Sequence, residues 1–69
     1  MWNLIEESSM IDNIFIGKLI AQSPQGEDRY VVKSIQFDGY VLAIHSNGKK
    51  EIKFFPVKEL IEGKWWVDV

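Results

Sequence analysis

Cysteine is absent from this 69-residue sequence, and histidine occurs only once. Without cysteine the chain has neither a disulfide framework nor a thiolate metal site, so apolar burial alone has to stabilise the fold. His45 is followed by Ser46, but neighbours on a strand point to opposite faces, which prevents them from acting as base and nucleophile. Glycine-rich phosphate motifs are missing, and the carboxylates are dispersed. We therefore expect a protein that is not an enzyme and that holds no cofactor and no metal.

Long apolar runs are also missing. No stretch approaches the roughly 18 to 20 apolar residues that a membrane-spanning helix needs. The first seven residues carry no lysine or arginine, whereas a secretory signal begins with a basic region. These features predict a cytoplasmic protein with no membrane association.

The sequence is rich in apolar and aromatic residues for its size. Hydrophobic residues make up 46% of the chain, and three tryptophans raise the aromatic share to 13%, which suits a core built without cross-links. Charged residues make up 26% with a formal net charge of -2, which excludes the composition of a disordered chain. A chain this short forms one domain, so we expect a single domain over residues 1–69.

Strand-like runs alternate with turn signals along most of the chain. Gly39 follows Asp38 in a two-residue turn, Asn47 and Gly48 mark a tight hairpin, and Pro56 lacks the amide donor that would continue a strand. The apolar and β-branched runs predict strands over 14–22, 29–37, 40–45, 50–55 and 64–69, with one 3₁₀ or helical turn over 57–61.

The first twelve residues follow a different pattern. Their apolar residues keep no strict period of two, and Asn3 followed by Glu6 is the residue pair of a helix N-cap. This pattern predicts an N-terminal segment over residues 1–12 that packs on the rest of the domain, with a short helix and a strand as the two alternatives for its conformation.

The order of the predicted elements resembles that of a small β-barrel family. Tyr40 to Ala43, the Asn47-Gly48 hairpin, Phe55-Pro56 and the turn ending at Leu60-Ile61 resemble the third strand, distal hairpin, fourth strand and 3₁₀ turn of SH3, Tudor and KOW modules. The resemblance covers roughly residues 30–61. It implies a mainly β fold, a five-stranded SH3-like barrel.

The resemblance implies less about the ligand. SH3 domains grip proline-rich peptides between aromatic rings, and Tyr40 and Pro56 stand where two of the groove residues would lie. However, Glu59 or Leu60 replaces the tyrosine of the turn, and the loop over 23–28 has no ring. A Tudor-like cage for a methylated cation would need converging rings. Its candidates are Tyr30, Phe37, Tyr40 and Phe55, which are otherwise expected to pack in the core or to lie half-buried.

The third predicted strand is apolar on both faces, with Leu42 and Ile44 on one side and Val41 and Ala43 on the other. A sheet face turned to water should be mainly polar. Something must therefore cover the second face. The candidates are the N-terminal segment, a heterologous protein, or a second copy of the chain as a homodimer.

These considerations favour a small protein–protein interaction module, an accessory or inhibitory protein such as a phage or mobile element encodes. Tryptophan and tyrosine are enriched at interface hot spots. Trp65 and Trp66 are adjacent, so one of them faces outward if both lie in a strand. The predicted partner-binding residues are Tyr40, Trp65, Trp2 and Pro56.

The alternative is a nucleic-acid-binding barrel, because KOW-like barrels contact RNA. Its phosphate-binding residues would be Lys33, Lys49, Lys50 and Lys53, beside Tyr40. The sequence pI of about 5.2 argues against a strong electrostatic grip on phosphates. A third possibility is a purely structural subunit that acts through self-association.

Overall fold

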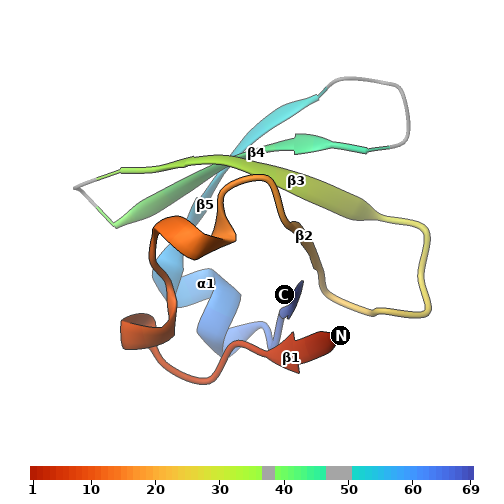
Figure 1. The fold of residues 1–69 in the computed structure, drawn as a ribbon, viewed down its shortest axis with the longest axis horizontal. Coiled ribbons are helices and arrows are strands. Elements are labelled where there is room, and N and C mark those ends of the chain that lie inside the picture. The colour runs from red at the N-terminus through yellow and green to blue at the C-terminus, as the bar shows by residue number, and fades with distance from the viewer. Residues whose placement is uncertain (37–38, 47–50) are drawn as a thin grey trace.

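Six strands form one antiparallel sheet in the computed structural model, which describes residues 1–36, 39–46 and 51–69. The strands are β1 (Trp2–Leu4), β2 (Leu19–Ala21), β3 (Arg29–Ile35), β4 (Tyr40–His45), β5 (Ile52–Pro56) and β6 (Trp66–Asp68). Two 3₁₀ turns, η1 (Ser8–Met10) and η2 (Asn13–Phe15), precede β2, and one helix, α1 (Val57–Glu62), separates β5 from β6 (Figure 1).

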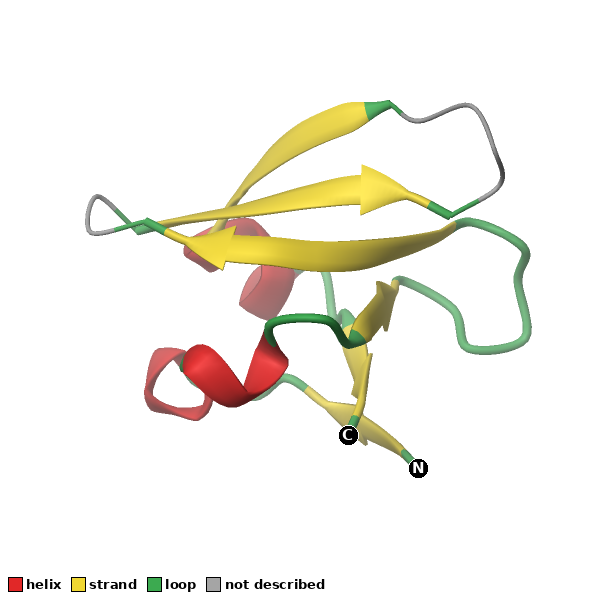
Figure 2. Ribbon diagram, turned by 45° about the horizontal axis from the view of Figure 1, so that its top comes forward, coloured by secondary structure: helices red, strands yellow, loops and turns green. Residues whose placement is uncertain are grey.

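The strand order in the sheet is β1-β6-β2-β3-β4-β5. Figure 2 shows β3, β4 and β5 as one layer, with β1, β2 and β6 in a second layer below it. Because β6 pairs with both β1 and β2, the two chain ends meet, and the Met1 amino group lies 2.7 Å from Asp68 Oδ1. Within the described residues β1 and β5 are open edges. The mainly β prediction is confirmed, but the sheet has six strands and is not the closed five-stranded barrel.

The hydrophobic core lies between the two layers. It draws on the inward side chains of the sheet, on Leu60 of α1 and on two N-terminal residues, Ile5 and Phe15. The other members are Ile20, Tyr30, Val32, Val41, Ala43, Phe55, Trp65 and Val67. Segments from both ends of the chain therefore share one core.

Glycines allow two of the tight connections. Gly39 has φ of +84° before β4, a backbone region that side chains with a Cβ rarely enter. Gly63 ends α1 and donates to the carbonyl of Glu59. A Cβ on Gly63 would lie 2.7 Å from that same oxygen, so the close turn into β6 requires glycine.

Several predicted elements are confirmed. Strand 40–45 matches β4, strands 29–37 and 50–55 match β3 and β5 to within two residues at each end, and the turn predicted over 57–61 is the six-residue helix α1. The Asn47-Gly48 hairpin lies outside the described residues, as does Asp38 of the first turn.

The structure decides one open alternative near the chain ends and corrects two predicted strands. The N-cap pair Asn3 and Glu6 starts no helix, because Trp2–Leu4 pairs with β6 instead. The strand predicted over 14–22 contains only β2, because the Asp12 carboxylate accepts from the Ile14 amide and caps η2, and Gly17 then turns the chain at φ of +85°. The last strand is also shorter, since Lys64 has a positive φ and β6 begins at Trp66.

Candidate functional site

The two faces of β4 lie in different environments. Val41 and Ala43 are fully buried in the core, whereas Leu42 and Ile44 point to the other side of the sheet and are only half-buried. The apolar character on both sides of this strand is therefore real. One side forms the core and the other remains accessible.

The accessible side continues across the neighbouring strands. Ile44 lies opposite Val31 of β3 and Ile52 of β5, and Leu42 lies opposite Phe54. Tyr40 lies opposite Pro56. We call this surface of β3, β4 and β5 the outer face, and it consists of Val31, Tyr40, Leu42, Ile44, Ile52, Phe54 and Pro56.

Large apolar side chains on the outer face are open to water. Ile52 is 62% exposed and Phe54 is 61% exposed, although both lie within a strand. Tyr40 is 39% exposed. Single exposed apolar residues are common on proteins, but here the exposed side chains are neighbours in the sheet.

The N-terminal segment does not cover the outer face. Ile5 is buried in the core, and Ile11 packs against the same core. The backbone of Ile5 donates to the carbonyl of Trp65, which ties this segment to the start of β6. The N-terminal segment, one of the three candidates for covering the second face of β4, is therefore not its cover, because Ile5 and Ile11 pack on the core side of the sheet.

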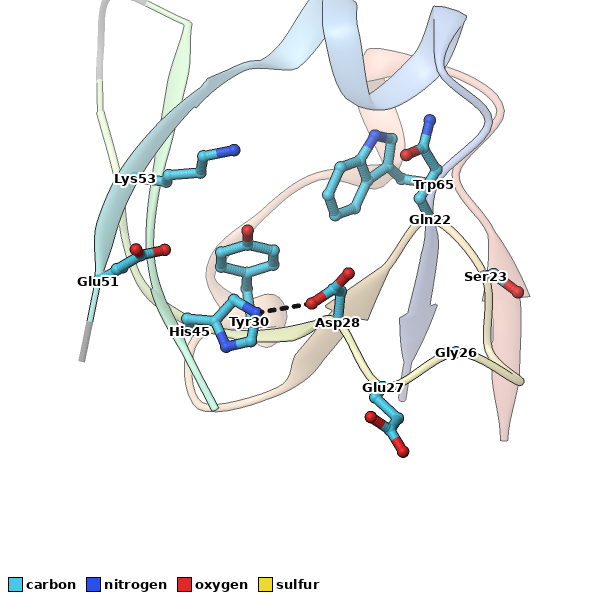
Figure 3. A pocket seen from close by; sticks show the side chains of 10 residues that line it. All are labelled: Gln22, Ser23, Gly26, Glu27, Asp28, Tyr30, His45, Glu51, Lys53 and Trp65. Atoms are coloured by element: carbon cyan, nitrogen blue, oxygen red, sulfur yellow. Dashed lines mark hydrogen bonds and ion pairs between the residues drawn. The ribbon is translucent and has the colours of Figure 1, made fainter. Parts of the chain in front are cut away.

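A cleft of about 640 Å³ opens at the other side of the sheet, at the mouth of the core (Figure 3). It is lined by Gln22, Ser23, Gly26, Glu27, Asp28, Tyr30, His45, Glu51, Lys53 and Trp65. Rings form its floor, and three carboxylates and one lysine surround them. The loop between β2 and β3 supplies one wall, and the start of β5 supplies the other.

Tyr30 is the centre of the ring cluster below this cleft. Its ring centroid lies 4.7 Å from that of His45 and 5.0 Å from that of Phe55, both in edge-on geometry. The ring of Trp65 is 6.0 Å from Tyr30 and 4.8 Å from Phe55. All four residues are buried. The rings pack against one another rather than standing apart as a cage, as the core-packing interpretation expected for Tyr30 and Phe55.

Two polar contacts border the ring cluster. His45 Nε2 lies 3.0 Å from Asp28 Oδ1, with the histidine buried and the carboxylate exposed (Figure 3). The Lys53 ammonium group lies 5.8 Å from the ring centroid of Tyr30 and 5.6 Å from that of Phe55, within the range of a cation–π contact. These contacts hold the loop after β2 and the edge strand β5 to the core. The Asp28 contact of His45 was not anticipated from the sequence.

The predicted partner-binding residues fall in three different places. Tyr40 and Pro56 belong to the outer face. Trp2 lies on β1, where its ring lies 5.6 Å from the Arg29 guanidinium carbon. Trp65 is only 7% exposed and is a core residue, while Trp66 is half-buried on β6. The structure therefore brings two of the four together.

The lysines predicted to bind phosphates lie in different surroundings. Lys33 is exposed at the β3 bulge, where the register with β4 shifts between Val32 and Ser34. Lys53 lies over core rings. Lys49 and Lys50 lie outside the described residues.

Ile52 and Phe54 were not singled out from the sequence, although they are the most exposed residues of the outer face. The sequence feature that could have identified them is the alternation of side chains along β5. Phe55 faces the core, so its neighbours Phe54 and Pro56 face outward. Pairing with the two-sided strand β4 would have placed them beside Leu42 and Ile44.

The described residues show no metal site and no membrane-spanning helix, and the chain has no match among the proteins compared. Among the described residues, no set of three or more histidine and carboxylate side chains could hold a metal ion. No helix in that part of the chain is long and apolar enough to cross a bilayer. Comparison with protein-family models, with curated proteins and with solved structures gave no match.

Proposed function

We propose that this chain is a small non-enzymatic docking module that binds another protein through its outer face. The observation that carries the proposal is the exposure of Ile52 and Phe54, at 62% and 61%, within a contiguous apolar sheet surface. Burying such a surface against a partner releases apolar area from water, which is the main favourable term in protein association. Tyr40 adds an aromatic ring with a hydroxyl at its tip, a residue type enriched at interface hot spots.

The composition of the outer face supports a protein partner over a nucleic acid. None of its seven residues is charged, and a grip on phosphates needs several lysines or arginines in reach of the backbone. Lys33 stands at the margin of this surface, whereas Lys53 is directed over the core rings. A partner that matches the outer face presents an apolar surface of its own.

An SH3-like barrel is the fold within which we place this module. Three consecutive strands, β3, β4 and β5, pair as neighbours, a helix follows Pro56, and a terminal strand pairs with β2. This order supports the resemblance noted in the sequence. The open edges at β1 and β5 and the additional strand β1 are departures from a closed five-stranded barrel.

Site-specific photocrosslinking in an extract of the source cells tests the proposed function. A photoreactive phenylalanine analogue at Phe54 should capture one partner protein, because this side chain is a large, exposed member of the outer face, beside Leu42. The same analogue at Glu59, which is exposed on α1, is the matched control and should not capture that protein. The double variant Ile52→Asp and Tyr40→Asp, made around the analogue at Phe54, should abolish capture.

The dependence on salt separates the two kinds of partner. Docking through the uncharged outer face should change little between low and moderate salt, whereas phosphate contacts lose about a thousandfold in affinity between 50 and 200 mM salt. Capture that is equal at Glu59 and Phe54, or a captured complex that nuclease treatment removes, would contradict the proposed function.

A further inference from the structure

Strand β5 is an open edge of the sheet, and its pairing with β4 shows which of its backbone groups face that edge. The His45 amide donates to the carbonyl of Glu51, and the Val57 amide donates to the carbonyl of Gly39. Hydrogen-bonded pairs alternate along an antiparallel ladder, so the residues of β5 at 53 and 55 also bond to β4. The backbone groups of the alternate residues therefore point away from β4.

Those alternate residues are Ile52, Phe54 and Pro56. Ile52 and Phe54 each present one amide donor and one carbonyl acceptor to the open edge, whereas Pro56 presents only its carbonyl. Their side chains also belong to the outer face, so an added strand would satisfy the backbone groups and cover exposed apolar surface together. Within the described residues, no segment pairs with this edge.

Lysine and proline on an edge strand normally discourage such pairing. Here they exclude some of the alignments between two antiparallel copies of β5. Each alignment, or register, is described by the residue that lies opposite its own counterpart at the two-fold axis. A register centred on Lys53 places the two lysines directly opposite each other in the pair with the closest side chains, which is unfavourable for like charges. A register centred on Phe55 leaves the amide of Ile52 without a carbonyl on the other copy of β5.

A register centred on Phe54 avoids both problems. The two Phe54 residues exchange two hydrogen bonds. Each Ile52 amide donates to the carbonyl of Pro56 on the other copy, and only the return bond is missing, because Pro56 has no amide hydrogen. All four edge donors are then used. Lys53 lies opposite Phe55 of the second copy, and the two Phe54 rings form an aromatic cross-strand pair.

We propose that two copies of this chain pair through β5 about a two-fold axis at Phe54. The pairing places the β3-β4-β5 layers of the two copies side by side, so that six strands present one continuous apolar surface. This inference deepens the proposed function, because the two outer faces become one docking surface that a two-fold or elongated partner can cover. Two strands of five residues bury well below the area of about 1,000 Å² that marks a stable interface, so the dimer is transient in the absence of the partner.

Cysteine cross-linking tests the register directly, because the natural chain contains no cysteine. In the proposed dimer, a Phe54→Cys substitution places two thiols in a hydrogen-bonded antiparallel pair, with Cα atoms about 5.5 Å apart and within disulfide range. Ile52→Cys is the matched control, since its side chain is equally exposed but the two copies of position 52 are about 13 Å apart in this register.

Pairing gives the thiols an effective concentration in the millimolar range, so Phe54→Cys should form the disulfide dimer at least about tenfold faster than Ile52→Cys. Equal rates would show random collision and would overturn the proposal. A faster rate for Ile52→Cys would overturn the register and the proposal with it.

A second measurement does not depend on the Phe54 side chain. Concentration-dependent NMR shifts of the natural chain should be largest at the Ile52 and Phe54 amides. Ile52→Pro removes an edge donor that β4 does not use, and it should weaken self-association by about tenfold relative to Ile52→Ala, which keeps that donor. Shifts confined to Leu42 and Ile44, or equal association of the two variants, would contradict edge pairing.

The two proposals can fail separately. If partner capture at Phe54 persists while cross-linking and self-association are absent, the docking function stands and the dimer is wrong. If the disulfide forms at Phe54 and no partner is captured there, the dimer stands and the docking function is wrong.

Discussion

Phe54 and Phe55 are adjacent, chemically identical residues of β5 that meet opposite environments. Phe55 is 2% exposed and packs on Tyr30 and Trp65, while Phe54 is 61% exposed on the outer face. Alternation along a strand separates the two rings. Apolar residues on the inner side of this sheet therefore stabilise the fold, whereas those on the outer side are available for binding.

Truncation of the two phenylalanines should give the largest difference. Phe55→Ala should lower the free energy of unfolding by about 3–5 kcal/mol, because it opens a cavity in the ring cluster. Phe54→Ala should change it by no more than about 0.5 kcal/mol, as expected for an exposed position. Denaturant unfolding followed by tryptophan fluorescence measures both. Equal losses would show that the outer face also stabilises the monomer, and the comparison would fail.

The adjacent tryptophans allow the same contrast at β6. Trp65→Ala should cost about 3 kcal/mol or more, because its buried ring packs on Tyr30 and Phe55 and truncation opens a cavity there. Trp66 is half-buried, and its truncation should cost about 1–2 kcal/mol. Thermal unfolding of both variants, with each emission spectrum compared with the natural chain, checks the order. The reverse order would mean that Trp66 is the core residue.

His45 and Asp28 compare a buried group with its exposed partner. His45→Ala removes the edge-on contact with Tyr30 as well as the contact with Asp28, and should cost about 2 kcal/mol. Asp28→Ala should cost no more than about 1 kcal/mol, because the carboxylate is 89% exposed and solvent screens its charge. Chemical denaturation at neutral pH distinguishes the two. A larger loss for Asp28→Ala would show that the contact with Asp28, rather than ring packing, holds this end of β4.

The smallest effect is expected at the Tyr30 hydroxyl. Tyr30 is only 7% exposed, and its hydroxyl forms no hydrogen bond with the other residues drawn around the cleft (Figure 3). Tyr30→Phe should therefore change the free energy of unfolding by about 0.5 kcal/mol or less, whereas Tyr30→Ala should cost several times more. Paired denaturation curves measure the difference. A substantial loss for Tyr30→Phe would reveal a hydrogen bond that stabilises the cleft.

The sequence predicted the central part of the fold better than its ends. Strands β3 to β5 were found because β-branched and aromatic runs were bounded by glycine and proline, and these signals act locally. Residues 14–16 were predicted as strand on the same grounds, but Ile14 and Phe15 belong to the 3₁₀ turn η2 and Ile16 caps it. The Asp12 cap and the positive φ of Gly17 override the β propensity there.

The candidate site was predicted in part. The second apolar side of β4 was recognised from Leu42 and Ile44, and Tyr40 and Pro56 were named among the binding residues. The choice of what covers that side could not be made, because it depends on the path of residues 1–12. Ile5 reaches the core only because β1 pairs with β6 at the far end of the chain.

Local sequence signals suffice for a β-rich domain stabilised by apolar burial, with turns at glycine and a strand end at Pro56. Those features follow from backbone sterics and side-chain composition, which act over a few residues. The burial of Trp65, the entry of Ile5 into the core and the exposure of Ile52 and Phe54 do not follow from such local signals. Each of these depends on pairing between strands distant in the sequence, because that pairing fixes which side of every strand faces the core.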